Sequence, residues 1–158
     1  MKPTFFLRSV LATALLFAAP AFATEKPDAA LSRWVKAVQT ANVDNIMKFY
    51  DDNAIMVSTF ADAPMVGRSA IVDYYKLVVV NPDIKVEVTD SHSRTFGNVA
   101  VITGLYTLSY TEEGEPVVIH SRFSFVYVLE GGKWLIVDHH ASRVPSEATG
   151  KTLVDRLW

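Results

Sequence analysis

Arg122 is the first side chain in this sequence whose type and position could do chemistry. It lies between Ser121 and Phe123, in a stretch that reads as the middle of a strand. An arginine in apolar surroundings is costly to bury unless its charge is paired. The guanidinium could therefore clamp the carboxylate of a ligand inside the domain. Alternatively, it could form a structural ion pair with Asp138, Asp90 or a helix acid.

Four histidines form the second group of candidates. His139 and His140 are consecutive in one predicted strand, so they should point to opposite faces of the sheet. A neutral histidine can act as a base, a hydrogen-bond donor or a ligand near pH 7, or it can simply be a satisfied core or interface residue. His92 and His120 lie on neighbouring strands. No His-x-His or His-x₃-His pair with a firm third ligand occurs, so we expect no metal site.

Tyrosines complete the candidate pocket. Tyr74, Tyr75, Tyr106 and Tyr110 could aim a hydroxyl at a ligand oxygen, or they could be core aromatics. The sequence has no nucleophile elbow, phosphate loop or dinucleotide fingerprint, so we expect neither covalent catalysis nor a cofactor. The residues predicted to line a ligand pocket are Arg122, His140, His139, Tyr106, Tyr75 and His92.

Helices are expected in the first half of the chain and strands in the second. Apolar residues at helical spacing predict helices over 29–41, around 46–50 and over 69–80, with a short strand over 54–59. Alternation and turn signals predict strands over 84–89, 99–110, 117–130 and 133–143. This order predicts an α+β domain, in which helices pack on one face of a curved antiparallel sheet.

The hairpin formed by the last two predicted strands suggests self-association. Pairing Glu130 with Lys133 places Phe123 and Phe125 on the same face as Asp138 and His140. Both faces of this hairpin are largely apolar, whereas an antiparallel sheet with one wet face alternates apolar and polar residues. One face should pack on the helices. The other is expected to pack on a second subunit, in a homodimer or higher oligomer, unless the C-terminal tail covers it.

The first 23 residues read as a cleavable secretory signal peptide. Lys2 and Arg8 precede the apolar run Val10–Ala19, and Ala21-Phe22-Ala23 provides a small-residue cleavage site. The run is shorter than the roughly 20 residues that span a bilayer, which disfavours the alternative of a membrane anchor. The sequence contains no cysteine. We therefore expect a single domain over 24–158 that is periplasmic or secreted and has no membrane anchor after cleavage.

Composition argues against a nucleic-acid partner, because acidic residues outnumber basic ones by 17 to 15 and no basic stripe occurs.

The C-terminal stretches Ser121–Tyr127 and Gly132–Pro145 resemble the nuclear transport factor 2-like superfamily. The closest resemblance is to exported bacterial relatives of the calcium/calmodulin-dependent protein kinase II association domain. It implies a cone-shaped fold with three helices on the concave face of the sheet. The chain has none of the kinase motifs, so kinase activity is not expected.

This superfold hosts many unrelated functions, so function must be argued from the site. The main expectation is an exported domain that self-associates through its sheet and binds a small organic ligand in the cone. An anion held by Arg122 is one candidate ligand. The alternative is a cofactor-free isomerase, dehydratase or cyclase acting on a small apolar substrate.

Overall fold

The computed structural model describes residues 25–145. The predicted signal peptide and the C-terminal tail that was considered as a cover for the sheet lie outside the described residues. The helices are α1 (Pro27–Val38), α2 (Val43–Met47) and α3 (Gly67–Val78). The strands are β1 (Tyr50–Val57), β2 (Met65–Val66), β3 (Lys85–Phe96), β4 (Val99–Glu112), β5 (Glu115–Glu130) and β6 (Lys133–Arg143).

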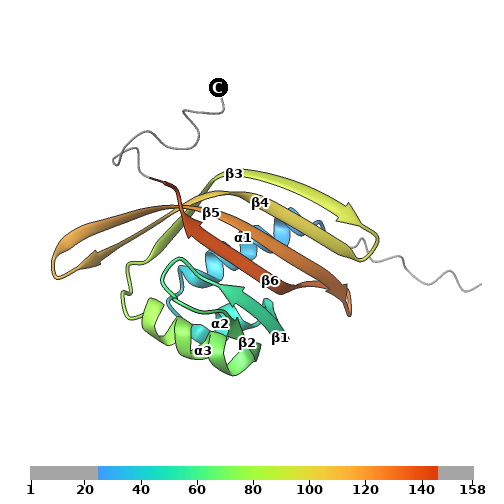
Figure 1. The fold of residues 1–158 in the computed structure, drawn as a ribbon, viewed down its shortest axis with the longest axis horizontal. Coiled ribbons are helices and arrows are strands. Elements are labelled where there is room, and N and C mark those ends of the chain that lie inside the picture. Colours follow the sequence, from blue (N-terminus) through green and yellow to red (C-terminus); the bar gives the residue numbers. More distant parts are fainter. Residues whose placement is uncertain (1–24, 146–158) are drawn as a thin grey trace, which may run out of the picture.

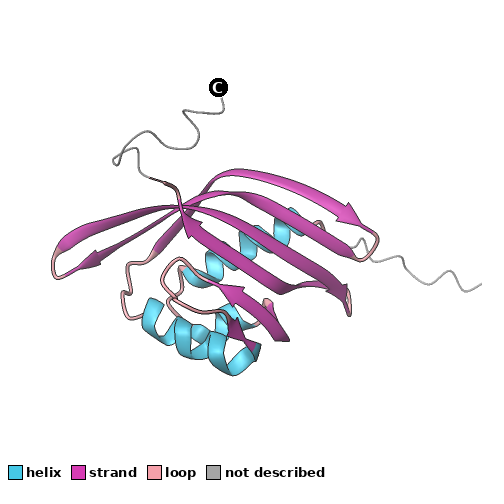
Figure 2. Cartoon of the chain, viewed as in Figure 1, coloured by secondary structure: helices cyan, strands magenta, loops and turns pink. Residues whose placement is uncertain are grey.

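The six strands form one curved sheet in the order β2-β1-β6-β5-β4-β3, shown in Figure 1. All neighbouring strands are antiparallel except β1 and β6, which run parallel. The helices cover one face: α1 packs against β3 and β4, and α3 packs against β1 and β2 (Figure 2). The predicted α+β class and cone-like architecture are therefore confirmed.

Local sequence explains where the first two helices begin. Pro27 occupies the start of α1, where its missing N–H costs no hydrogen bond. The side chain of Asn42 caps α2 by accepting a hydrogen bond from the backbone N–H of Asn45 at 3.1 Å. The second helix ends earlier than expected because Tyr50 already pairs with Ile136 in the sheet. Consequently β1 begins at Tyr50 rather than at residue 54.

The core lies between the helices and the concave face of the sheet. Along β5, Ser121, Phe123, Phe125 and Tyr127 are buried, whereas Arg122 is exposed. Trp34 from α1 meets Phe125 edge-on, with ring centroids 4.9 Å apart. Burying side chains of this size stabilises the fold by about 1.5–3 kcal/mol each.

A β-bulge in the last hairpin corrects the predicted register. Pairing is as predicted from Glu130 with Lys133 to Tyr127 with Ile136. Val126 then pairs with Asp138, so Val137 has no partner in the β5–β6 ladder. One extra residue moves every later side chain to the other face. The prediction that Asp138 and His140 share the face of Phe125 is therefore wrong. His139, which pairs directly with Phe125, lies on that face instead.

A second irregularity lies between β3 and β4. The pairing shifts between Val88 and Asp90, opposite Tyr106 and Leu105, and Gly104 follows as the partner of Ser91. A Cβ added at Gly104 would come within 2.0 Å of the Asp90 carbonyl oxygen, so only glycine allows this close approach. β3 also extends to Phe96, well beyond the predicted end at residue 89. Its second half is exposed and polar, so alternation could not predict it.

Candidate functional site

A chain of three buried polar side chains lies inside the cone. The hydroxyl of Tyr50, at the start of β1, is 2.8 Å from the Tyr75 hydroxyl on α3 and 2.7 Å from Nδ1 of His139 on β6. The three residues are 1%, 3% and 2% exposed, respectively. The imidazole also packs against Phe125, with ring centroids 4.1 Å apart. These polar groups are thus enclosed within an aromatic core.

Counting donors and acceptors assigns the tautomer of His139. The Tyr50 hydroxyl has one proton to donate. Two groups beside its oxygen can donate to it: the Tyr75 hydroxyl, which is 2.8 Å away, and the indole N–H of Trp34, which completes no hydrogen bond of its own. We therefore assign the Tyr50 proton to the hydrogen bond with Nδ1 of His139. In that arrangement Nε2 of His139 carries the imidazole proton.

Burial keeps this network neutral. Desolvation lowers the pKa of His139 to about 3, and the neighbouring His140 adds to the effect. Burial raises the pKa of Tyr50 well above its ordinary value, although the donors of Tyr75 and Trp34 oppose the rise. Burial likewise raises the pKa of Tyr75. At neutral pH the group therefore consists of an uncharged imidazole and two protonated phenols.

His139 also borders a small inner cavity of about 30 Å³. Its Nε2 atom has no hydrogen-bond partner within residues 25–145. A cavity of this size has room for a water molecule or one small chemical group. Its walls are Trp34, Val38, Met56, Ser58, Phe60, Tyr74, Tyr75, Val78, Val86, Tyr106, Leu108 and His139.

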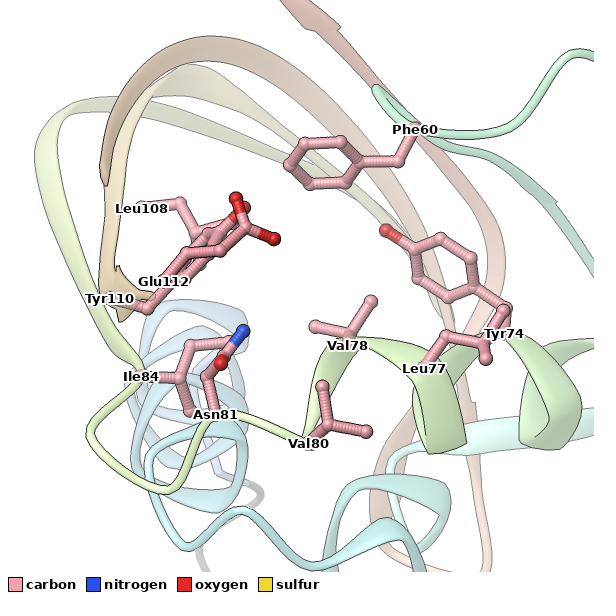
Figure 3. A pocket seen from close by; sticks show the side chains of 10 residues that line it. All are labelled: Phe60, Tyr74, Leu77, Val78, Val80, Asn81, Ile84, Leu108, Tyr110 and Glu112. Atoms are coloured by element: carbon pink, nitrogen blue, oxygen red, sulfur yellow. The ribbon is translucent and has the colours of Figure 1, made fainter. Parts of the chain in front are cut away.

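A larger outer cavity of about 200 Å³ opens beside the C-terminal end of α3 (Figure 3). Phe60, Tyr74, Val78 and Leu108 line both cavities, so the two adjoin. The walls are mainly apolar, and the Glu112 carboxylate and the Asn81 amide supply polar groups at the outer end. None of the residues lining either cavity is a lysine or an arginine.

The hydroxyl of Tyr74 lies at the junction of the two cavities. It accepts a hydrogen bond from Oγ of Ser58, which leaves its own proton free for donation. Burial raises the pKa of Tyr74 to about 12, so the phenol stays protonated. A ligand in the outer cavity would therefore meet a neutral donor at its inner end.

The structure brings together three of the six predicted pocket residues. Tyr75, Tyr106 and His139 all border the inner cavity.

The other three lie on the outer face of the sheet. Arg122 is exposed and donates from Nε to Oγ of Ser142 at 2.9 Å, so its expected role as an anchor inside the cone is wrong. His140 pairs with Ser124 and is exposed because of the bulge. His92 is exposed and contacts Asp90, with Nε2 3.2 Å from Oδ2.

Sequence reasoning missed Tyr50, Trp34 and Ser58 as site residues. Tyr50 falls within the helix predicted around 46–50, but it begins β1, whose partner β6 lies far along the chain. Trp34 belongs to the apolar side of the helix predicted over 29–41, and it is part of the core, since it is 3% exposed. No local motif marks any of these residues.

Two further observations concern residues 25–145. No group of three or more His, Asp or Glu side chains is arranged there to hold a metal ion. None of the helices in this part of the chain has the length and apolar character needed to cross a membrane.

The chain belongs to the SnoaL-like domain family, whose model matches residues 28–147. No match was found among curated proteins. A solved structure from Xanthomonas campestris, provisionally assigned as a calcium/calmodulin-dependent protein kinase II association domain, is 26% identical. It has a TM-score of 0.71 and covers 75% of this chain and 86% of its own.

Two more distant structures share the fold. One, provisionally assigned as a dehydratase of the NTF2-like family from Streptomyces avermitilis, is 18% identical with a TM-score of 0.67. It covers 75% of this chain and 94% of its own. The S. rosetta CaMKII hub is 20% identical with a TM-score of 0.65, and the coverage is 73% and 92%. The resemblance to the nuclear transport factor 2-like superfamily is thus confirmed.

Proposed function

We propose that this domain binds a small, neutral organic molecule in the cavity between α3 and β4. The observation that carries the proposal is the apolar outer cavity, which adjoins an inner cavity bordered by an unpartnered buried imidazole nitrogen. Pockets with apolar walls and a few convergent polar groups are typical of ligand sites. Phe60, Leu77 and Val80 are also exposed at the outer cavity, at 43%, 74% and 68%.

The charge of the lining favours a neutral ligand over an anion. Arg122, the expected anion anchor, lies on the opposite face of the sheet, and the outer cavity carries Glu112 instead. A carboxylate ligand would have to be desolvated there without a cationic partner, which is costly.

Titration of a library of small neutral and acidic compounds into the labelled protein, followed by NMR, tests this proposal. We expect neutral compounds to perturb the resonances of Tyr74, Val78 and Leu108. Val78→Phe should fill the cavity and abolish these changes, whereas Val118→Phe, at an exposed site on β5, should not. Binding that persists in Val78→Phe would contradict the proposal.

We further propose that the domain self-associates through the outer face of the sheet. Leu105 and Val118 are 40% and 56% exposed on this face, and Val126 and Val128 are half-buried there. The fold likeness to a CaMKII hub supports the idea. Light scattering should detect a dimer or larger species that Val126→Glu dissociates and Val66→Glu, on β2, does not. A monomer at all accessible concentrations would exclude it.

A cofactor-free isomerase, dehydratase or cyclase is the second candidate function. It is favoured by the hydrogen-bonded His139 and Tyr50 beside the inner cavity and by the fold likeness to the assigned dehydratase. Its weakness is the base: the pKa of His139 is lowered to about 3, so a neutral imidazole there is a poor proton acceptor. Turnover of a bound compound that is lost in His139→Asn would establish it.

Export remains part of the proposal. The N-terminal sequence of the protein recovered from its native cells should begin at Thr24 if the signal peptide is removed as proposed. A recovered chain that still begins at Met1 would contradict it.

A further inference from the structure

The strongest unexplained feature of the interior is Nε2 of His139. The residue is 2% exposed, its Nδ1 is taken by Tyr50, and its Nε2 has no partner within residues 25–145. A buried polar atom without a partner is uncommon in folded proteins and calls for a physical reason. Here the atom belongs to a residue that borders a cavity, so a bound group can supply the missing partner.

We propose that the ligand is a neutral carbonyl compound whose oxygen occupies the inner cavity and accepts a hydrogen bond from Nε2–H of His139. This inference rests on the proposed function, and it specifies the chemical class of the ligand. It excludes ligands that offer only a donor or only hydrocarbon at that position.

The hydrogen-bond direction follows from the network behind the imidazole. The Tyr50 hydroxyl is 2.8 Å from the Tyr75 hydroxyl and 2.7 Å from Nδ1 of His139. We infer that Tyr75 donates to Tyr50 and that Tyr50 donates to Nδ1, because the indole N–H of Trp34 also lies beside the Tyr50 oxygen. This leaves the proton on Nε2, so the imidazole presents a donor and needs an acceptor. The role of Tyr50 and Tyr75 in recognition is to hold this tautomer; they are positioning residues.

The cavity sizes fix the shape of the ligand. About 30 Å³ accommodates an oxygen atom or a similar small group, whereas the body of the ligand must lie in the outer cavity of about 200 Å³. The shared walls of Phe60, Tyr74, Val78 and Leu108 connect these two spaces, and Figure 3 shows their side chains around the outer one. A compact apolar body with a terminal carbonyl satisfies both constraints.

The surroundings select a neutral carbonyl over a carboxylate. Nε2–H of His139 and the Tyr74 hydroxyl are uncharged donors, and neither cavity is lined by a lysine or an arginine. A neutral carbonyl oxygen is satisfied by one or two such donors, whereas an unpaired buried carboxylate pays a much larger desolvation cost. At the outer end Glu112 would also repel a negative group.

Three matched probes test the inference on the wild-type mature chain: acetophenone, its hydrocarbon isostere α-methylstyrene, and benzoate. We expect acetophenone to bind at least about tenfold more tightly than α-methylstyrene, because only the ketone pairs the buried donor. Benzoate should bind more weakly than acetophenone. Equal binding of ketone and isostere would overturn the inference while leaving the proposed pocket intact. Failure of all three probes to bind would overturn the proposed function, and the inference with it.

Two substitutions at His139 separate the donor from the rest of the side chain. His139→Gln keeps an N–H near the position of Nε2 and should retain most of the preference for the ketone. His139→Asn keeps a group that can pair with Tyr50 but removes the inner donor. Acetophenone and α-methylstyrene should then bind this variant about equally tightly. An unchanged preference in His139→Asn would overturn the inference.

A measurement that needs no variant covers the case in which a substitution prevents folding. Long-range ¹H–¹⁵N correlation spectra of the imidazole distinguish the two neutral tautomers in the wild-type protein. We expect the Nε2–H form, with a further shift of the Nε2 resonance on addition of acetophenone but not of α-methylstyrene. A proton found on Nδ1 would overturn the inference.

Discussion

His139 and His140 are neighbours on β6, but they lie in two different environments. His139 is buried among Trp34, Tyr50 and Phe125, and its ring is neutral. His140 is exposed on the opposite face, beside Ser124. One step along a strand therefore separates a buried aromatic interior from the exposed outer face of the sheet. Both residues are histidines, so the bulge at Val137 alone decides that His139, and not His140, belongs to the site.

The largest expected difference between the two faces is in packing. Phe125→Ala removes a ring that is fully buried, so we expect a loss of about 3–5 kcal/mol in the free energy of unfolding. Val126→Ala, the next residue and on the outer face, should cost much less in the monomer. Denaturant unfolding measures both changes. Similar losses would mean that the outer face is as well packed as the interior.

Acid should destabilise the protein through His139. Its pKa is about 3 in the folded state, against about 6.5 in an unfolded chain. Between these values the unfolded state takes up a proton that the folded state does not, so stability falls as the pH falls through this window. The slope approaches about 1.4 kcal/mol per pH unit once the unfolded-state histidine is mostly protonated, so we expect a loss of about 2.3 kcal/mol from pH 6.5 to 4.5.

The control for this pH dependence is the neighbouring residue. His139→Asn should flatten the dependence of unfolding free energy on pH, and His140→Asn should leave it close to that of the wild type. The reverse result would show that the two histidines had been assigned to the wrong faces.

Tyr50→Phe tests the buried hydrogen bonds with little change in shape. It removes the hydroxyl that links Tyr75 to His139 and leaves two buried polar groups unpaired. We expect a cost of about 1–3 kcal/mol in thermal or denaturant unfolding. Tyr110→Phe, on a half-buried ring at the outer cavity, is the matched control and should cost less. Equal costs would argue that the network adds nothing to stability.

Arg122→Ala should have the smallest effect. The side chain is exposed and donates one hydrogen bond to Ser142, so unfolding free energy should change by no more than about 0.5 kcal/mol. Binding of any compound that occupies the cavity should be unaffected. A loss of such binding in this variant would place the guanidinium back among the ligand-binding groups.

Much of the fold could be predicted because its signals are local. Helical spacing around Trp34, alternation along β5 and the Gly131-Gly132 turn each depend on a few adjacent residues. They were sufficient for the α+β class, the bounds of β6 and the order of every helix and strand except the two-residue β2, which was not predicted.

The site was only half predictable, because its assembly depends on distant pairing. The sequence Val137-Asp138-His139-His140 has no feature that marks a bulge. Regular pairing therefore placed His140 on the face of Phe125, where the structure places His139. Arg122 was placed inside because its strand neighbours are apolar. Tyr50 could not be linked to His139, since 89 positions separate the two residues in the chain.

The parallel pairing of β1 with β6 also affects the rate of folding. β1 is the first strand of the domain and β6 the last, so their ladder closes a loop that spans nearly the whole described chain. Contacts of this kind raise contact order and slow folding. During synthesis, Tyr50 emerges long before its hydrogen-bond partner His139, and a nascent chain that ends before β6 lacks His139. The polar interior is therefore completed only when the C-terminal strand joins the sheet.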